Sequence, residues 1–159
     1  MSWHFVDLSM LRDIELFSKL SDDALREVAA LTTFEEHPPS ARIFEEGDAG
    51  AAMYMIMRGE VRISKDIPGV GEEALAFLDQ GAYFGEMSLV GDEPIRSATA
   101  ITESPVKLAK LSRADFRGLL VDNQTVGIEI LTSFVNTLAD RLRASNEKLA
   151  FFAMSDMFE

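Results

Sequence analysis

The sequence predicts an α+β fold, in which an antiparallel, jelly-roll-like β roll is flanked by N-terminal helices and a long C-terminal helix. Apolar residues recur at helical spacing up to residue 32, and a heptad pattern from Ile128 to Phe152 predicts a long helix over 124–153. Between them, across residues 33–111, short apolar runs are separated by Gly-containing turns without intervening helical patterns, which favours a roll over βαβ units. At 159 residues we expect a single domain.

The N-terminal region, residues 1–32, is expected to form two short helices. Leu8, Leu11 and Ile14 recur at helical spacing. A second helix is predicted to begin after Ser21, because a serine is a good N-cap and the acids that follow it favour the positive end of the helix dipole.

The expected roll consists of short strands. Residues 53–63 are predicted to alternate between buried and exposed around a tight turn at Arg58-Gly59. Residues 74–78, 98–101 and 106–111 are predicted to supply further strands.

After the roll we expect a short helix over 112–122, capped by Ser112, and then the long helix over 124–153. The long helix has an apolar seam about 37 Å long with alternating steps of 3 and 4. The seam residues are Ile128, Leu131, Val135, Leu138, Leu142, Ser145, Leu149 and Phe152. Such a seam packs either on the roll of its own chain or on its twin in a homodimer, and its narrowness favours the dimer.

Composition excludes several classes of function. The net charge of −12 would repel nucleic acids and anionic lipids, so we expect neither direct nucleic-acid binding nor membrane binding. The absence of cysteine excludes disulfides and thiolate metal sites, and it fits a cytoplasmic location. His4 and His37 have no carboxylate at ligand spacing, so neither a metal site nor a catalytic site is predicted and the chain is not expected to be an enzyme.

The stretch Tyr83–Ala100 contains the candidate binding residues. Gly85 can expose backbone N–H groups at a short helical turn, and Arg96 can offer a planar fork to two phosphate oxygens. Glu86 cannot bind phosphate but can accept hydrogen bonds from a sugar hydroxyl. Alternatively, Glu86 and Arg96 simply neutralise each other, and the chemistry of the residues leaves both possibilities open.

The segment "FGEMSLVGDEPIRSATA" resembles the phosphate-binding cassette of the cyclic nucleotide-binding domain family. "ELFSKLSDDALREVAAL", "IFEEGDAGAAMYMIMRGEVRI" and "LSRADFRGLL" resemble other parts of that domain, so the resemblance covers roughly residues 10–152. Because Arg96 follows Glu86 by ten residues, the cassette (residues 83–100) is most similar to the sensor domain of the bacterial catabolite activator protein, the cAMP receptor.

The resemblance implies roles for individual residues. Arg96 would bind the cyclic phosphate, and Glu86 would accept a hydrogen bond from the ribose 2′-OH. Ser145 and Asn146 match the positions at which the long helix contacts adenine from each subunit. The full set of ligand-binding residues implied is Gly85, Glu86, Met87, Ser88, Arg96, Ser97, Ala98, Ser145 and Asn146.

The function implied is that of a regulatory or sensor domain that binds a cyclic nucleotide and acts on a protein partner. Ser97 matches the cAMP-binding activator, whereas a threonine at this place is associated with guanine, so cAMP is the expected ligand and cGMP the alternative. A degenerate interaction module that binds no nucleotide, and the sensor half of a truncated transcription regulator, are also compatible with the same residues.

Overall fold

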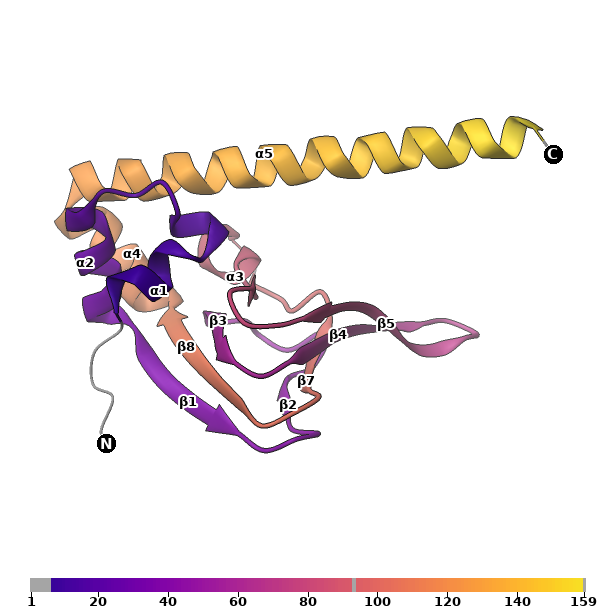
Figure 1. The fold of residues 1–159 in the computed structure, drawn as a ribbon, viewed down its shortest axis with the longest axis horizontal. Helices are drawn as coiled ribbons and strands as arrows, with labels where there is room; N and C mark the ends of the chain where they lie inside the picture. The colour runs from indigo at the N-terminus through magenta and orange to yellow at the C-terminus, as the bar shows by residue number, and fades with distance from the viewer. Residues whose placement is uncertain (1–6, 93, 159) are drawn as a thin grey trace.

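The computed structural model describes residues 7–92 and 94–158 (Figure 1). Three helical segments come first: α1 (Leu8–Arg12), η1 (Glu15–Phe17) and α2 (Asp22–Leu31). Ser21 is the N-cap of α2 and its Oγ accepts a hydrogen bond from the N–H of Ala24 at 3.2 Å, as predicted. Residues 1–6 of the expected N-terminal region, with His4, lie outside the described residues.

The roll consists of two antiparallel four-stranded sheets, ordered β1-β8-β3-β6 and β2-β7-β4-β5, which confirms the predicted fold class. The hairpin turn between β3 and β4 contains Gly59, with φ of +91°, where the Arg58-Gly59 pair predicted it. The strands are β1 (Thr33–His37), β2 (Arg42–Phe44), β3 (Ala52–Arg58), β4 (Val61–Ile67), β5 (Gly71–Leu78), β6 (Tyr83–Phe84), β7 (Thr99–Thr102) and β8 (Val106–Ser112).

Strand β3 corrects the expected alternation over residues 53–63. Its first six residues are all buried, because β3 is covered on both faces. Met53, Met55 and Met57 pack in the hydrophobic cluster formed with the helices. Tyr54 and Ile56 pack in a second cluster inside the roll. A strand between two apolar layers needs apolar residues at every position, so burial does not alternate along it.

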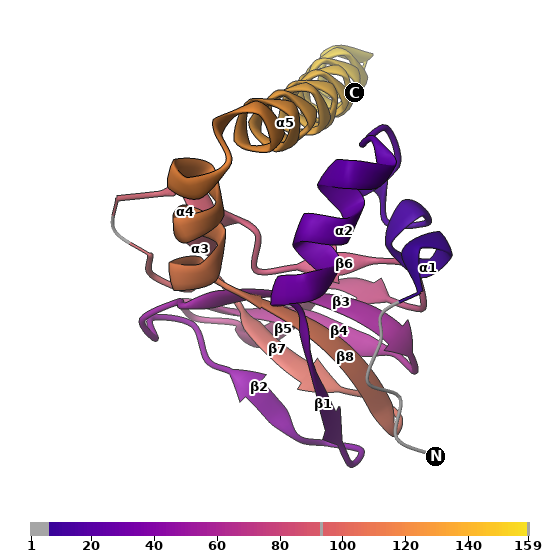
Figure 2. The ribbon, with the colours of Figure 1, turned by 90° about the vertical axis from the view of Figure 1, so that its left-hand side faces the viewer.

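Helix α4 (Arg113–Asp122) begins after Ser112, whose Oγ accepts from the N–H of Asp115 at 3.1 Å. It is followed by α5 (Gln124–Ser155) and the short η2 (Asp156–Phe158). The first half of α5 covers α2 and α4 (Figure 2). The ring of Phe134 in α5 stacks on the ring of Phe116 in α4, with centroids 5.5 Å apart. The second half of α5 extends beyond the body of the protein (Figure 1).

Helix α5 therefore has two apolar stripes. Val126, Ile130 and Phe134 are buried against the rest of the chain. The predicted seam lies on a different stripe and stays accessible, with Ile128 67% and Leu142 62% exposed. The possibility that this seam packs on the chain's own roll is therefore wrong, and the second, buried stripe was not anticipated.

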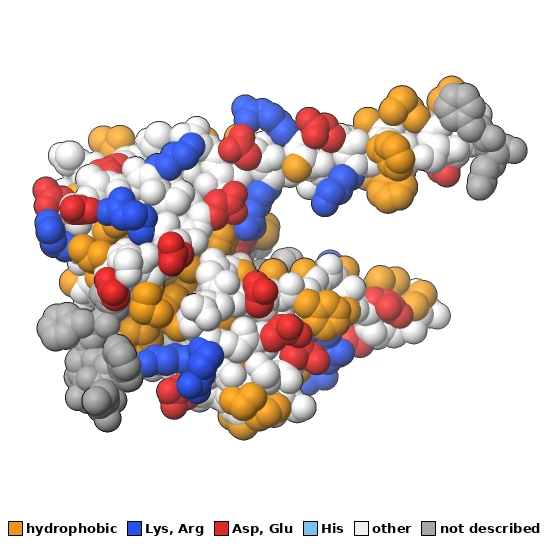
Figure 3. All heavy atoms as spheres, in the orientation of Figure 1, with side chains coloured by type: hydrophobic (Ala, Val, Ile, Leu, Met, Phe, Trp, Pro, Cys, Tyr) orange, Lys and Arg blue, Asp and Glu red, His pale blue; other side chains and the backbone are white. Residues whose placement is uncertain are grey.

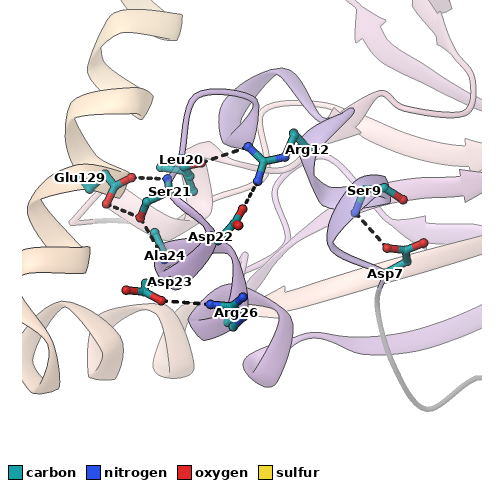
Figure 4. A network of polar contacts seen from close by, with 10 residues as sticks. All are labelled: Asp7, Ser9, Arg12, Leu20, Ser21, Asp22, Asp23, Ala24, Arg26 and Glu129. Atoms are coloured by element: carbon teal, nitrogen blue, oxygen red, sulfur yellow. Dashed lines mark hydrogen bonds and ion pairs between the residues drawn. The ribbon is translucent and has the colours of Figure 1, made fainter.

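A polar network joins the start of α2 to α5 (Figure 4). The carboxylate of Glu129 accepts hydrogen bonds from the N–H of Ser21 and, at 2.9 Å, from its Oγ. Arg12 forms an ion pair with Asp22 and also donates to the carbonyl of Leu20 at 3.4 Å. The contacts of Glu129 attach the first half of α5 to the start of α2, and those of Arg12 join α1 to α2.

Candidate functional site

A cavity of about 240 Å³ lies between the roll, the short helix α3 (Met87–Val90) and α5. Above it the second half of α5 stands clear of the roll in the space-filling view (Figure 3). The volume of the cavity is just below the usual range for small-molecule sites. The lining residues are Phe44, Ile63, Leu78, Tyr83, Phe84, Gly85, Glu86, Met87, Ser88, Ile95, Arg96, Ser97, Ala98 and Arg141.

The cavity brings together seven of the nine predicted site residues, those of the cassette. Ser145 and Asn146 do not line it; both are exposed on the second half of α5, beyond Arg141. In a single chain, the structure therefore assembles the part of the predicted site that is local in the sequence.

Gly85 is required by two features of the site. Its φ of +78° lies in the left-handed region that favours glycine. A Cβ at this position would stand 2.6 Å from Nη1 of Arg96, closer than non-bonded atoms approach. The absence of a side chain at Gly85 thus allows the guanidinium of Arg96 to lie against the backbone.

Arg96 is buried, with 6% of its surface exposed, and donates three hydrogen bonds to neutral groups. Nη1 donates to Oγ of Ser88 at 2.9 Å and to the carbonyl of Gly85 at 3.4 Å. Nη2 donates to the carbonyl of Ala52 at 2.7 Å. A guanidinium has five N–H donors, and the buried Nε–H has no partner among the described residues. Two hydrogens, one on Nε and one on Nη2, are thus left for an acceptor.

The charge of Arg96 has no counter-ion among the described residues, since none of their carboxylates lies within 4.0 Å of it. Burial lowers the pKa of Arg96, while Tyr54, Asp48 and Glu86 raise it from a distance. An arginine stays protonated in proteins, so a buried positive charge remains at this site. The alternative that Glu86 and Arg96 neutralise each other is wrong.

Glu86 instead pairs with Arg141 of α5. Its Oε1 lies 3.4 Å from Nη1 of Arg141, whose Nη2 lies 3.5 Å from the carboxylate of Glu15. The guanidinium of Arg141 also stands 4.5 Å above the ring of Tyr83, where cation–π attraction acts. Burial raises the pKa of the Tyr83 phenol, whose hydroxyl has no hydrogen-bond partner in the part of the chain that the structure describes. Arg141 therefore joins the cassette, η1 and α5.

The cavity residues that sequence reasoning missed include Phe44, which contacts Arg96, and Arg141, which pairs with Glu86. Arg141 stands four residues before Ser145 on the same helix, and this spacing is the signal that would have suggested it. Phe44 lies on β2, far from the cassette in sequence, and no local pattern connects it to Arg96.

Comparison with known proteins identifies the fold that holds this cavity. The family profile described as the cyclic nucleotide-binding domain matches residues 34–123, which include β2–β8, the cassette, α4 and all of β1 except Thr33. The chain belongs to the cyclic nucleotide-binding domain family. This domain is a regulatory module that binds cyclic nucleotides, not a catalytic one.

The relatives of this chain include a cyclic AMP receptor protein and a cGMP-dependent protein kinase. The chain is 40% identical over 93 residues to the cyclic AMP receptor protein of Thermus thermophilus, covering 57% of this chain and 43% of that protein. It is 30% identical over 128 residues to the cGMP-dependent protein kinase egl-4 of Caenorhabditis briggsae, covering 79% of this chain and 17% of the kinase. The chain thus spans less than half the length of these curated relatives.

The solved structure of the Thermus thermophilus catabolite activator protein has the same architecture, with a TM-score of 0.75 and 31% sequence identity. The similarity covers 87% of this chain and 63% of that one. It confirms the predicted β roll with flanking helices and the resemblance to the catabolite activator.

Among the described residues, no helix is long and apolar enough to cross a membrane. The same residues contain no group of three or more side chains that could hold a metal ion. His37 does have a carboxylate neighbour, which corrects the expectation: its Nε2 lies 3.1 Å from Oε2 of Glu35. Lys110 donates to the other oxygen of Glu35 at 2.8 Å, so this carboxylate belongs to a polar cluster at the sheet surface.

Proposed function

We propose that this domain is a cAMP sensor, and the observation that supports it most is the unpaired, buried charge of Arg96. A cyclic nucleotide is a monoanion with two free phosphate oxygens. The unused hydrogens on Nε and Nη2 suit those oxygens, and a charge-assisted pair of hydrogen bonds would also neutralise the guanidinium. Gly85, Met87, Ser88, Ser97 and Ala98 line the same cavity, and we assign them to the phosphate and its surroundings.

Glu86 is proposed to accept a hydrogen bond from the ribose 2′-OH. Its side chain is 16% exposed and its Oε1 is engaged with Arg141 at 3.4 Å, which is long for a charged hydrogen bond. A ribose hydroxyl that binds Glu86 therefore competes with, or is shared with, Arg141. Since Arg141 belongs to α5, the ligand would act on the long helix at this contact.

The base is proposed to be adenine. Ser97, where a threonine is associated with guanine, and the identity to the Thermus cyclic AMP receptor support cAMP. The identity to the worm cGMP-dependent kinase supports cGMP as the second candidate. Apolar side chains of the roll, including Ile63 and Leu78, line the cavity and would contact the ligand without distinguishing the two bases.

We propose that two chains pair through the exposed seam of α5. Leu142 and Leu149 are 62% and 67% exposed in the single chain, and a row of such residues on a free helix is stable once a second helix covers it. In such a homodimer the long helices of both subunits would approach the base, with Ser145 and Asn146 contributed one from each subunit. This would place the whole predicted site in the dimer and not in one chain.

The signal would travel by population shift: ligand favours the arrangement of α5 that binds it better, and a protein partner reads that arrangement. We place this sensor, a single domain over residues 1–159, in the cytoplasm. The unpaired Arg96 argues against a degenerate module, because burying a charge without a counter-ion costs stability that a bound anion would recover. The sensor half of a transcription regulator is compatible with the same chemistry.

Titration calorimetry with cAMP, cGMP and cyclic di-GMP tests the proposal. We expect one site per chain, with cAMP binding more tightly than cGMP and no binding of cyclic di-GMP. Tighter binding of cGMP would refute the assignment of adenine. Failure of all three to bind, or to raise the melting temperature at millimolar concentration, would leave the degenerate module as the correct function.

A further inference from the structure

The face of the Arg96 guanidinium is covered by an aromatic ring. Cζ of Arg96 lies 3.9 Å from the ring centroid of Phe44, the last residue of β2. Phe44 is held in place by two further rings, with centroid distances of 6.1 Å to Tyr54 and 5.8 Å to Phe84. Tyr54 is itself 5.9 Å from Cζ of Arg96, so Phe44 provides the closest π contact to the charge.

The direction of this contact matters for binding. The N–H groups of a guanidinium all lie in its plane, and a carboxylate partner would use them up. A ring attracts the same charge through its negative face, from above the plane. Phe44 therefore stabilises the charge of Arg96 and leaves the Nε and Nη2 hydrogens available.

The ring of Phe44 and a bound phosphate are alternative partners that stabilise the buried charge of Arg96. The attraction between ring and guanidinium is electrostatic, so it weakens when an anion in the plane neutralises the charge. If the contact between ring and guanidinium is stronger in the free protein than in the complex, the free energy of binding becomes less favourable by the difference between the two contact energies. Phe44 thus stabilises the ligand-free fold and lowers ligand affinity.

We propose that Phe44 is an affinity-setting residue, which compensates the buried charge of Arg96 until the phosphate of a cyclic nucleotide replaces it. The affinity part rests on the proposed function, whereas the contact between ring and guanidinium can be tested without ligand. Phe44 acts through Arg96, so it is a positioning residue.

The experiment replaces Phe44 in the full chain by mono-, di- and trifluorinated phenylalanine, which withdraw electron density from the ring at almost constant size. The melting temperature of the ligand-free protein should fall stepwise along the series. The melting temperature with saturating cAMP should fall less, and the Kd for cAMP should decrease by about two- to fivefold. The matched control is the same series at Phe84, which belongs to the same ring cluster. We expect no stepwise fall there.

The same substitutions in a variant without the Arg96 charge test whether the effect depends on that charge. In Arg96→Met the fluorinated series at Phe44 should leave the melting temperature unchanged, because no cation remains above the ring. Equal falls in both backgrounds, or no trend in the native one, would show that Phe44 only packs and would refute the proposal. If the melting temperature falls equally with and without cAMP along the series, and the Kd stays constant, the phosphate does not replace the ring as the partner of Arg96 and this part of the proposal is refuted. A native chain that binds neither cAMP nor cGMP would refute the proposed function and the affinity part together, while the ligand-free melting series would still decide the contact.

Discussion

Replacement of Arg96 is the sharpest perturbation of the proposed site. Arg96→Ala removes the guanidinium with its three hydrogen bonds to Ser88, Gly85 and Ala52, and it also removes the charge that the phosphate is proposed to meet. Arg96→Lys keeps a charge but cannot reproduce a planar fork. The two variants therefore separate the charge from its geometry.

The expected magnitude follows from the burial of the site. A phosphate in a pocket where Arg96 is 6% exposed would be partly desolvated, and its loss of a counter-charge resembles breaking a buried ion pair. Such breaks cost about 3–5 kcal/mol, or roughly two to three and a half decades of affinity for Arg96→Ala. Arg96→Lys should recover only part of this loss, because it restores a point charge without the second hydrogen bond.

Titration calorimetry with cAMP measures the loss, and thermal melting of each variant without ligand checks that it folds. Arg113→Lys is the matched control: Arg113 is half-buried and donates to the carbonyl of Ser88 at 2.6 Å, yet it does not line the cavity. We expect its affinity to stay close to that of the native chain. If folded Arg96→Ala binds cAMP as well as the native chain does, the arginine has only a structural role and the anion site lies elsewhere.

The remaining predictions concern other parts of the molecule. Glu86→Gln should lower cAMP affinity by about 1–2 kcal/mol in calorimetry, less than Arg96→Lys does, because an amide oxygen still accepts from a hydroxyl; an unchanged affinity would place the ribose elsewhere. Gly85→Ala should lower both the melting temperature and the affinity, since its Cβ would stand 2.6 Å from Nη1 of Arg96; normal binding would mean that the loop readily shifts. Leu142→Asp should give monomers in light scattering without loss of folding, because Leu142 is 62% exposed in the single chain; a native chain that is already monomeric, with or without ligand, would refute the pairing. Glu35 contributes stability at neutral pH: partial burial pushes its pKa upward, but hydrogen bonds from Lys110 and His37 lower it overall from 4.5. A carboxyl whose folded pKa is lowered stabilises the fold above its unfolded pKa, and this stability is lost as the pH falls below about 4.5. The melting temperature of Glu35→Gln should therefore fall less steeply below that pH than that of the native chain, and identical slopes would contradict the assignment.

Much of the fold could be predicted from the sequence, because its determinants are local. Ser21 and Ser112 marked the starts of α2 and α4 through cap hydrogen bonds that span three residues. The Gly59 turn and the heptad pattern of α5 are likewise short-range features. The cassette was recognisable for the same reason, since Gly85 and Arg96 lie only eleven residues apart.

Tertiary structure alone decided which residues from outside the cassette meet it at the cavity. Arg141 comes from a position 55 residues after Glu86, and Phe44 from a strand far ahead of the cassette. Arg141 pairs with the carboxylate of Glu86, and Phe44 covers the face of the Arg96 guanidinium. Glu86 and Arg96 therefore have different partners, although they are close in sequence.

The same distinction explains β3 and α5. The periodicity of a segment states which of its residues share a face, but not how many faces another element will cover. Strand β3 became buried on both faces when helices and the second sheet closed over it. In α5 the stripe of Val126 and Phe134 became buried, while the seam with Leu142 remained exposed. Burial is a property of the assembled layers, so the sequence determined the local elements and the tertiary structure determined which of their surfaces are in contact.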